Sequence, residues 1–237
     1  MSTATNLSRA AGDAAVSDTE VRIRTAAIVL FAERGYAATG IRDIAGAAGI
    51  TTAAIYHHFA NKEELLVDII RVGQQALNER TARSLEGVER PEQRLALLIS
   101  GLVATHGINR MSALVGDTEL RALTPDAPAY RELVQLRDDY EALWSRTLRD
   151  GASEGVFEFA AERSTRLGLL TMCTGISRWY RPGGELDLAS LCAHFTDLGL
   201  AAVRARRGRR PVRAAAVTLV DPATVPRIPG EPEEEAA

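Results

Sequence analysis

Apolar residues recur at steps of three and four along almost the whole chain between residues 17 and 204. This spacing places side chains on one face of an α-helix, whereas a half-buried β-strand alternates at every second residue. Neither strand-like alternation nor an internal repeat interrupts the pattern, and glycine or proline separates the successive segments. The sequence therefore predicts an all-α fold.

Composition narrows the class of protein. The net charge of −3 supplies no overall basic field, and the two cysteines, Cys173 and Cys192, are too few for a disulfide scaffold or a four-cysteine zinc site. We expect them to be buried as small apolar side chains in a reducing compartment. Residues 1–20 lack the apolar core of a secretory signal, and no uncharged stretch is apolar enough to span a membrane. These features predict a cytoplasmic protein without a membrane partner.

The first four predicted helices carry clear boundary signals. Ser17 and Glu20 form a capping box at the start of the first helix, and Asn61 caps the fourth. Gly35 and Gly49 end the first two helices. A long helix followed by two short ones across a glycine turn predicts a helix-turn-helix, with helices over 17–34, 41–48 and 52–59.

Five further helices are expected around Leu95–Thr105, Met111–Leu123, Tyr130–Gly151, Glu162–Tyr180 and Asp187–Arg204. The segment Glu162–Tyr180 has almost no polar side, so it should be covered on more than one face. We expect the last two helices to pair with their symmetry mates in a four-helix interface.

Several separated motifs between residues 26 and 66, LFAERGY, IRDIA, IYHHF and NKEEL, occur in one register. This segment resembles the N-terminal DNA-binding domain of TetR-family transcriptional regulators. The helical remainder is similar in length to the family's variable ligand-binding and dimerisation domain. The resemblance implies a ligand-responsive repressor that acts as a homodimer on a palindromic operator of double-stranded DNA.

The resemblance also implies a division of the chain. Residues 17–66 would form the helix-turn-helix domain and residues 67–204 the helical ligand-binding and dimerisation domain. Residues 1–16 and 205–237 would be disordered tails. Six arginines lie between residues 204 and 213, and a nonspecific contact of this run with DNA phosphates is the alternative to a solvated extension.

Helical geometry and the resemblance together assign the DNA contacts. Ile55 and Phe59 lie four residues apart and should face inward, leaving the other side of their helix accessible. Threonine and alanine can touch base edges, tyrosine and histidine can reach phosphates, and the family position that Arg42 matches can reach a guanine. The predicted DNA-binding residues are Thr39, Arg42, Thr51, Thr52, Ala53, Tyr56, His57 and Lys62.

The chain departs from the family pattern at a few of these positions. Gly40 stands where the family usually has a serine or threonine cap, and Ala53 and Ala54 replace a glycine and a serine or threonine. Few polar groups are therefore left for base recognition. Residues 18–65 hold five basic and six acidic groups, so we expect binding to use a small, well-placed set of phosphate contacts.

A second motif points to the effector. Residues 176–184, ISRWYRPGG, with DTELR at 117–121, resemble the TetR branch that senses acyl-CoA thioesters in fatty-acid and sterol degradation. We expect a pocket beside the helix over Tyr130–Gly151, with His106 and Arg178 as polar anchors and Trp144 and Trp179 in its wall. A lipophilic drug or natural product, as in efflux-controlling relatives, is the alternative effector. Packing of Trp179 at the dimer interface is the alternative for that side chain.

Other classes of function find less support in the sequence. The chain shows no nucleophile–base pair and no phosphate-cradling glycine loop, so we predict no catalytic residues and no cofactor. His57 and His58 point about 100° apart on a helix, which argues against a metal site. An enzyme with a helical substrate domain and a ligand-independent architectural DNA binder remain the rival hypotheses.

Overall fold

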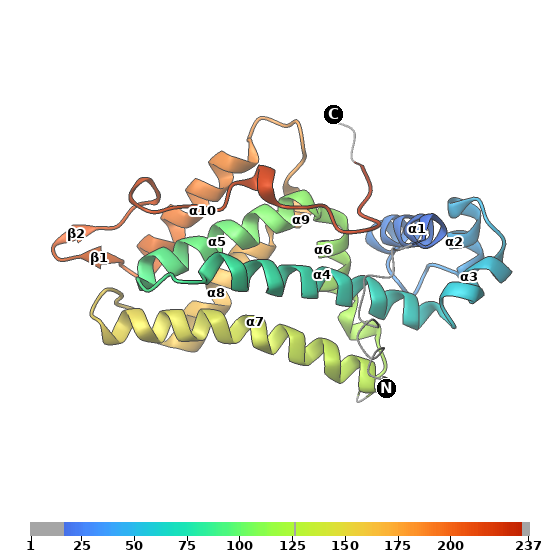
Figure 1. The fold of residues 1–237 in the computed structure, drawn as a ribbon, viewed down its shortest axis with the longest axis horizontal. Helices are drawn as coiled ribbons and strands as arrows, with labels where there is room; N and C mark the ends of the chain where they lie inside the picture. The colour runs from blue at the N-terminus through green and yellow to red at the C-terminus, as the bar shows by residue number, and fades with distance from the viewer. Residues whose placement is uncertain (1–16, 126, 234–237) are drawn as a thin grey trace, which may run out of the picture.

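The structure, a computed structural model, describes residues 17–125 and 127–233 and is almost entirely helical, as predicted (Figure 1). The predicted tail over residues 1–16 lies outside the described residues. The Ser17 hydroxyl accepts the N–H of Glu20, and the Asn61 amide oxygen accepts that of Glu64. The side-chain caps at Ser17 and Asn61 are therefore confirmed, while the reciprocal capping-box bond of Glu20 stays a prediction. The first helices are α1 Asp18–Arg34, α2 Ile41–Ala48, α3 Thr52–His58 and α4 Lys62–Leu85.

The second part of the chain folds around α5, which lies among the other helices. The elements after α4 are α5 Pro91–Ile108, α6 Arg110–Glu119, the 3₁₀ turn η1 Leu120–Ala122, α7 Pro128–Ser153, α8 Glu162–Thr174, α9 Ile176–Trp179 and α10 Leu188–Ala202. The expectation of one helix over Glu162–Tyr180 is wrong. The chain divides at Gly175, a residue of low helix propensity, into α8 and α9.

Two apolar clusters form the core. One joins α1, α2 and α3 around Phe31, Ile44 and Ile55, and the larger one surrounds α5 and contains the fully buried Trp144. Helix α4 contributes to both clusters, and α6 reaches the first through the buried Val115. The predicted division between residues 66 and 67 therefore falls inside a helix that both parts of the core share.

The prediction that the chain is disordered after Arg204 is wrong for residues 205–233. Strand β1 Arg206–Arg207 pairs antiparallel with β2 Arg210–Pro211. Residues 214–233, here called the strap, then run back across the molecule to α1 (Figure 1). The strap contains two 3₁₀ turns, η2 Ala214–Ala216 and η3 Pro222–Thr224.

Buried polar groups on α5 explain why the strap packs. A buried amide or hydroxyl is costly unless it is hydrogen-bonded. The Gln93 side chain donates to the Thr218 carbonyl at 2.7 Å and accepts the Thr218 N–H at 2.9 Å. The Ser100 hydroxyl accepts the N–H of Val220 at 3.0 Å. Two polar residues seven positions apart on an apolar helix were the available sequence signal for this partner.

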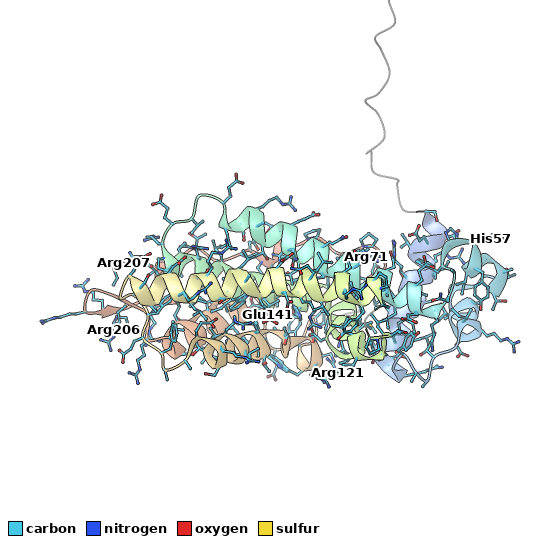
Figure 2. The ribbon with its side chains drawn as sticks, turned by 90° about the horizontal axis from the view of Figure 1, so that it is seen from below. His57, Arg71, Arg121, Glu141, Arg206 and Arg207 are labelled. Carbon is cyan, nitrogen blue, oxygen red and sulfur yellow. The ribbon has the colours of Figure 1, made fainter. Side chains whose placement is uncertain are left out.

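The arginine run lies at the end of the molecule opposite α3. Arg206 and Arg207 lie at one end of the long axis and His57 at the other (Figure 2). Arg207 pairs with Glu92 at 2.5 Å and Arg204 with Glu158 at 2.6 Å. The fold therefore does not favour a contact between this run and the DNA that α3 would bind. Among the residues that the structure describes, no helix is both long and apolar enough to cross a membrane.

Candidate nucleic-acid interface and effector cavity

The turn between α2 and α3 is held from inside. Arg22 of α1 donates through Nη2 to the Ala48 carbonyl at 2.5 Å, just before the left-handed Gly49. Ile44 of α2 and Ile55 of α3 are fully buried beneath the turn. The two short helices are therefore fixed relative to α1, which is what a helix that enters a DNA groove requires.

The outer side of α3 is open. Tyr56 is 55% exposed, and Thr51, Ala53 and His57 are exposed beside it while Thr52 is half-buried. The Thr51 hydroxyl accepts the N–H of Ala54 and caps the helix. Arg42 is exposed on α2. These six predicted contacts lie on surface that DNA could reach.

Thr39 is not part of that surface, which corrects its assignment as a DNA contact. Its side chain is buried, and the hydroxyl lies 2.9 Å from the Gly35 carbonyl and 3.3 Å from the Leu30 carbonyl. A threonine hydroxyl often bonds to nearby backbone in this way. Thr39 therefore stabilises the α1–α2 turn from within.

Lys62 has a structural role at the start of α4. Its ammonium donates to the carbonyls of Tyr36 and Thr39, both at 2.8 Å, and lies 4.1 Å from the centre of the Tyr36 ring. An ammonium has three donors, so two are engaged within the protein. A phosphate contact by the third stays a prediction.

The second part of the chain contains a partly open cavity of about 660 Å³. Helices α4 to α9 and the strap line it, and its apolar wall includes Ile69, Leu77, Leu102, Tyr140 and Leu170. This volume lies within the usual range for small-molecule sites. The cavity thus has the size and the lining of an effector pocket.

The polar groups of the cavity carry an excess of positive charge. Three acidic residues also line it, Glu79, Asp117 and Glu141. The arginines that line it are Arg80, Arg83, Arg121, Arg137 and Arg178. Five positive and three negative side chains leave an excess of two positive charges, which favours a ligand with anionic groups.

Two of these groups, Asp117 and Arg137, form a connected cluster with His106. The His106 Nδ1 lies 3.1 Å from the Leu102 carbonyl, and its Nε2 lies 3.5 Å from an oxygen of Asp117. Arg137 approaches the other Asp117 oxygen at 3.8 Å. Arg80 donates to the carbonyl of Gly101 and to the hydroxyl of Thr105, and burial lowers the pKa of its guanidinium.

The structure brings only part of the predicted ligand set to the cavity. His106 and Arg178 line it, but Trp144 and Trp179 do not, and their assignment is corrected. Trp144 is fully buried in the core, and Trp179 is 49% exposed and stacks on Phe195. Asp117 belongs to the DTELR motif that the sequence singled out, whereas no sequence feature indicated Arg80 or Tyr140.

Cys173 and Cys192 are buried and unbridged, and burial raises the pKa of both thiols.

A helix-turn-helix at one end of the chain and a cavity within a helical second part define a ligand-binding transcriptional regulator. Residues 23–69 match the family described as bacterial regulatory proteins, tetR family, and residues 88–203 match the Tetracyclin repressor-like C-terminal domain. The chain belongs to the TetR family of DNA-binding transcriptional regulators.

Several relatives resemble the chain over most of its length. The HTH-type transcriptional repressor KstR2 of Mycobacterium tuberculosis is 29% identical over 178 residues, which are 75% of this chain and 88% of the relative. The structure of the ketosteroid transcriptional regulator KstR2 from that organism aligns with a TM-score of 0.74 at 26% identity, over 84% of this chain and all of the other. AibR, in complex with isovaleryl coenzyme A and operator DNA, shares the fold with a TM-score of 0.67 at 22% identity, over 77% and 97% of the two chains.

Proposed function

We propose that the protein is a homodimeric repressor that binds a palindromic operator through α3 of each subunit and is released by an acyl-CoA thioester, in control of lipid or sterol catabolism. The observation that carries this proposal is the cavity, which joins an apolar wall to an excess of arginine. An acyl or steroid group would occupy the apolar part, and Arg178 and Arg121 would pair with phosphates of the CoA. KstR2 is described as a ketosteroid transcriptional regulator, and AibR was solved with isovaleryl coenzyme A. Both relatives support an acyl-CoA or steroid-derived thioester as the effector.

The proposed dimer rests on an apolar surface that the single chain leaves open. Trp179 stacks on Phe195, and Leu198 follows one turn later on α10 at 44% exposure. A second copy of the chain would cover these side chains. Such a contact would fit the prediction that the last helices pair with their symmetry mates.

The effector class is tested on a preformed complex of the protein with its operator, obtained by sequencing the genomic fragments that the protein retains. Palmitoyl-CoA and a steroid-derived CoA thioester should release the DNA, because only they supply both the apolar group and the phosphates. The free acids and CoA alone should not. Fluorescence anisotropy of the labelled operator measures release. Release by a neutral lipophilic compound, with none by either thioester, would instead support an efflux-type or secondary-metabolism repressor.

Replacing Arg178 with alanine should weaken release by the thioester about tenfold, the effect of one lost charge-assisted hydrogen bond. Operator affinity without the thioester should be unchanged, because Arg178 lies at the cavity and not near α3. Arg149→Ala removes the same charge from the exposed side of α7 and serves as the control. If both variants need the same thioester concentration for half-release of the operator, Arg178 does not bind the effector.

The DNA surface is tested with Tyr56 and Arg42. Tyr56→Ala should weaken binding on operator and scrambled duplexes alike, because a phosphate contact carries no sequence information. Arg42→Ala should weaken binding to the operator more than binding to the scrambled duplex. The difference in binding free energy should be about 1–3 kcal/mol if the guanidinium contacts a guanine. Gel shifts on both duplexes measure the two effects, with Arg149→Ala again as the control. Unchanged affinity of both variants for both duplexes would place the recognition surface elsewhere.

A further inference from the structure

The strap contributes a wall of the effector cavity that lies outside the matched family domain. The family match ends at residue 203, and the strap begins at residue 214. Val225, Pro226 and Ile228 of the strap line the cavity beside the helices. Ile228 approaches α4 at Gly73, where a Cβ would lie 3.7 Å from its Cδ1. Any ligand that fills the cavity therefore faces this segment.

The strap is fastened at the cavity by one buried side chain. Asn109, between α5 and α6, donates through Nδ2 to the Pro226 carbonyl at 3.1 Å. Its Oδ1 accepts the N–H of Ile228 at 2.8 Å. The two bonds hold the backbone at Pro226 and Ile228, two of the strap residues that line the cavity. Because Asn109 is buried, they are shielded from competition by water.

A second fastening joins the strap to the start of α6. Asn109 precedes α6 but makes no side-chain cap bond to it, because its amide holds the strap. The Glu231 carboxylate instead accepts the N–H of Met111 at 2.9 Å and of Ser112 at 3.0 Å. A negative charge at this position also complements the dipole of the helix. The strap thereby completes the helix that reaches both the cavity and the N-terminal core.

A third contact places the strap directly on the DNA-binding domain. Gly230 has φ +95° and lies against α1, where a Cβ would come within 2.6 Å of Arg24 Cβ and 3.3 Å of Thr25 N. Arg24 is itself tied to Asp68 of α4 and to Glu20, both at 2.6 Å. Only Arg227, Ile228 and Pro229 separate the cavity-lining Pro226 from this contact, and the cavity-lining Ile228 is two residues away. A displacement of the ligand-facing Ile228 would therefore reach the α1 contact through only two residues of backbone.

We propose that the strap is an effector-contacting element that carries the response from the cavity to α1: Val225 and Ile228 contact the ligand, and Gly230 and Glu231 transmit their displacement. A ligand that shifts Ile228 must move the two residues after it or break their contacts with α1 and α6. Such a shift favours the orientation of the N-terminal domain that no longer matches the operator. This inference rests on the proposed ligand-responsive function. The alternative outcome is that the strap is only a structural cover for α5.

Gly230→Ala tests the transmission, with Gly208→Ala as the matched control. Both glycines have positive φ, but a Cβ on Gly208 meets nothing within 4 Å while one on Gly230 collides with α1. The operator dissociation constant is measured with and without saturating palmitoyl-CoA and the steroid-derived thioester. Their ratio should be about 5–150 in the wild-type protein, the usual range of coupling, and should fall toward one in Gly230→Ala alone. A ratio equal to that of the control would overturn the transmission.

A ligand-free readout separates failure of this inference from failure of the proposed function. Hydrogen exchange at the Met111 and Ser112 amides should be at least about tenfold faster in Gly230→Ala than in Gly208→Ala, because displacing the strap end removes their acceptor. Equal exchange would show that Gly230 does not hold Glu231 in place and would overturn the transmission. If no thioester releases the wild-type protein from its operator, the proposed effector class is wrong. Hydrogen exchange at Met111 and Ser112 would still show whether Gly230 holds Glu231 in place.

Val225→Ala tests the ligand contact, and Val220→Ala is its control. Both remove the same two methyl groups from the strap, but only Val225 lines the cavity. Affinity for palmitoyl-CoA and the steroid-derived thioester, measured without DNA by tryptophan fluorescence, should fall several-fold in Val225→Ala only. Equal affinities for both thioesters in the two variants would remove the strap from the ligand contacts.

Discussion

Trp144→Ala is expected to lower the free energy of unfolding by about 3–5 kcal/mol, the usual cost of truncating a buried tryptophan. Trp144 is fully buried, and its ring meets that of Tyr140 edge-on at 6.3 Å between centroids. Alanine would leave a cavity that the packed helices around it cannot close. Urea unfolding followed by circular dichroism measures the change, with the denaturant slope checked for a constant exposed surface.

Trp144→Phe separates the core role from a ligand role. Phenylalanine keeps most of the buried ring, so the loss of stability should be much smaller than for alanine. Release of operator by the thioester should then stay at the wild-type level, because Trp144 does not line the cavity. A stable Trp144→Phe protein that no longer responds to the thioester would return Trp144 to the effector site.

Leu198→Glu is expected to give monomers and to weaken binding to a palindromic operator by about 100-fold or more, the loss when two linked half-site contacts become independent. Leu198 is 44% exposed in the single chain and lies one turn from Phe195, against which Trp179 stacks. A carboxylate there would be desolvated if a second copy covered it, and the cost would favour dissociation. Sedimentation velocity and gel shifts measure the two effects.

Leu191, also on α10, does not suit this test, because it is buried within the core of the chain. A charge at Leu191 would unfold the subunit and would say nothing about assembly. Ala82→Glu puts the same charge on an exposed position of α4 and should leave both mass and DNA affinity unchanged. A Leu198→Glu protein that sediments as a dimer would place the subunit interface on another surface.

The helix-turn-helix shows which structural features local sequence signals can predict. The caps at Ser17 and Asn61 and the inward-facing Ile55 were all predicted, because each depends on residues within about four positions. The same signals placed Tyr56 on the open face. They could not show that the ammonium of Lys62 is held by carbonyls 26 and 23 residues away, or that Thr39 turns inward.

The cavity depended far less on local pattern. His106 and Arg178 come from helices whose apolar stripes were evident, yet the same stripes offered Trp144 and Trp179 as equally good candidates. Which side of a helix faces a cavity, the core or solvent depends on where its neighbours lie. Periodicity defines an apolar side but does not say what covers it.

The sequence by itself determined that the chain is helical and where most helices begin and end, because helix caps and periodicity are properties of neighbouring residues. The motifs between residues 26 and 66 added the resemblance of the N-terminal part to the TetR helix-turn-helix. Only the tertiary structure decided that residues 205–233 are ordered and that the strap joins the cavity to α1. An extended segment has no period of its own, and its backbone groups find partners as far as 125 residues away, as Gln93 and Thr218 do. Those partners exist only once the helices have packed and left their buried polar groups to be satisfied.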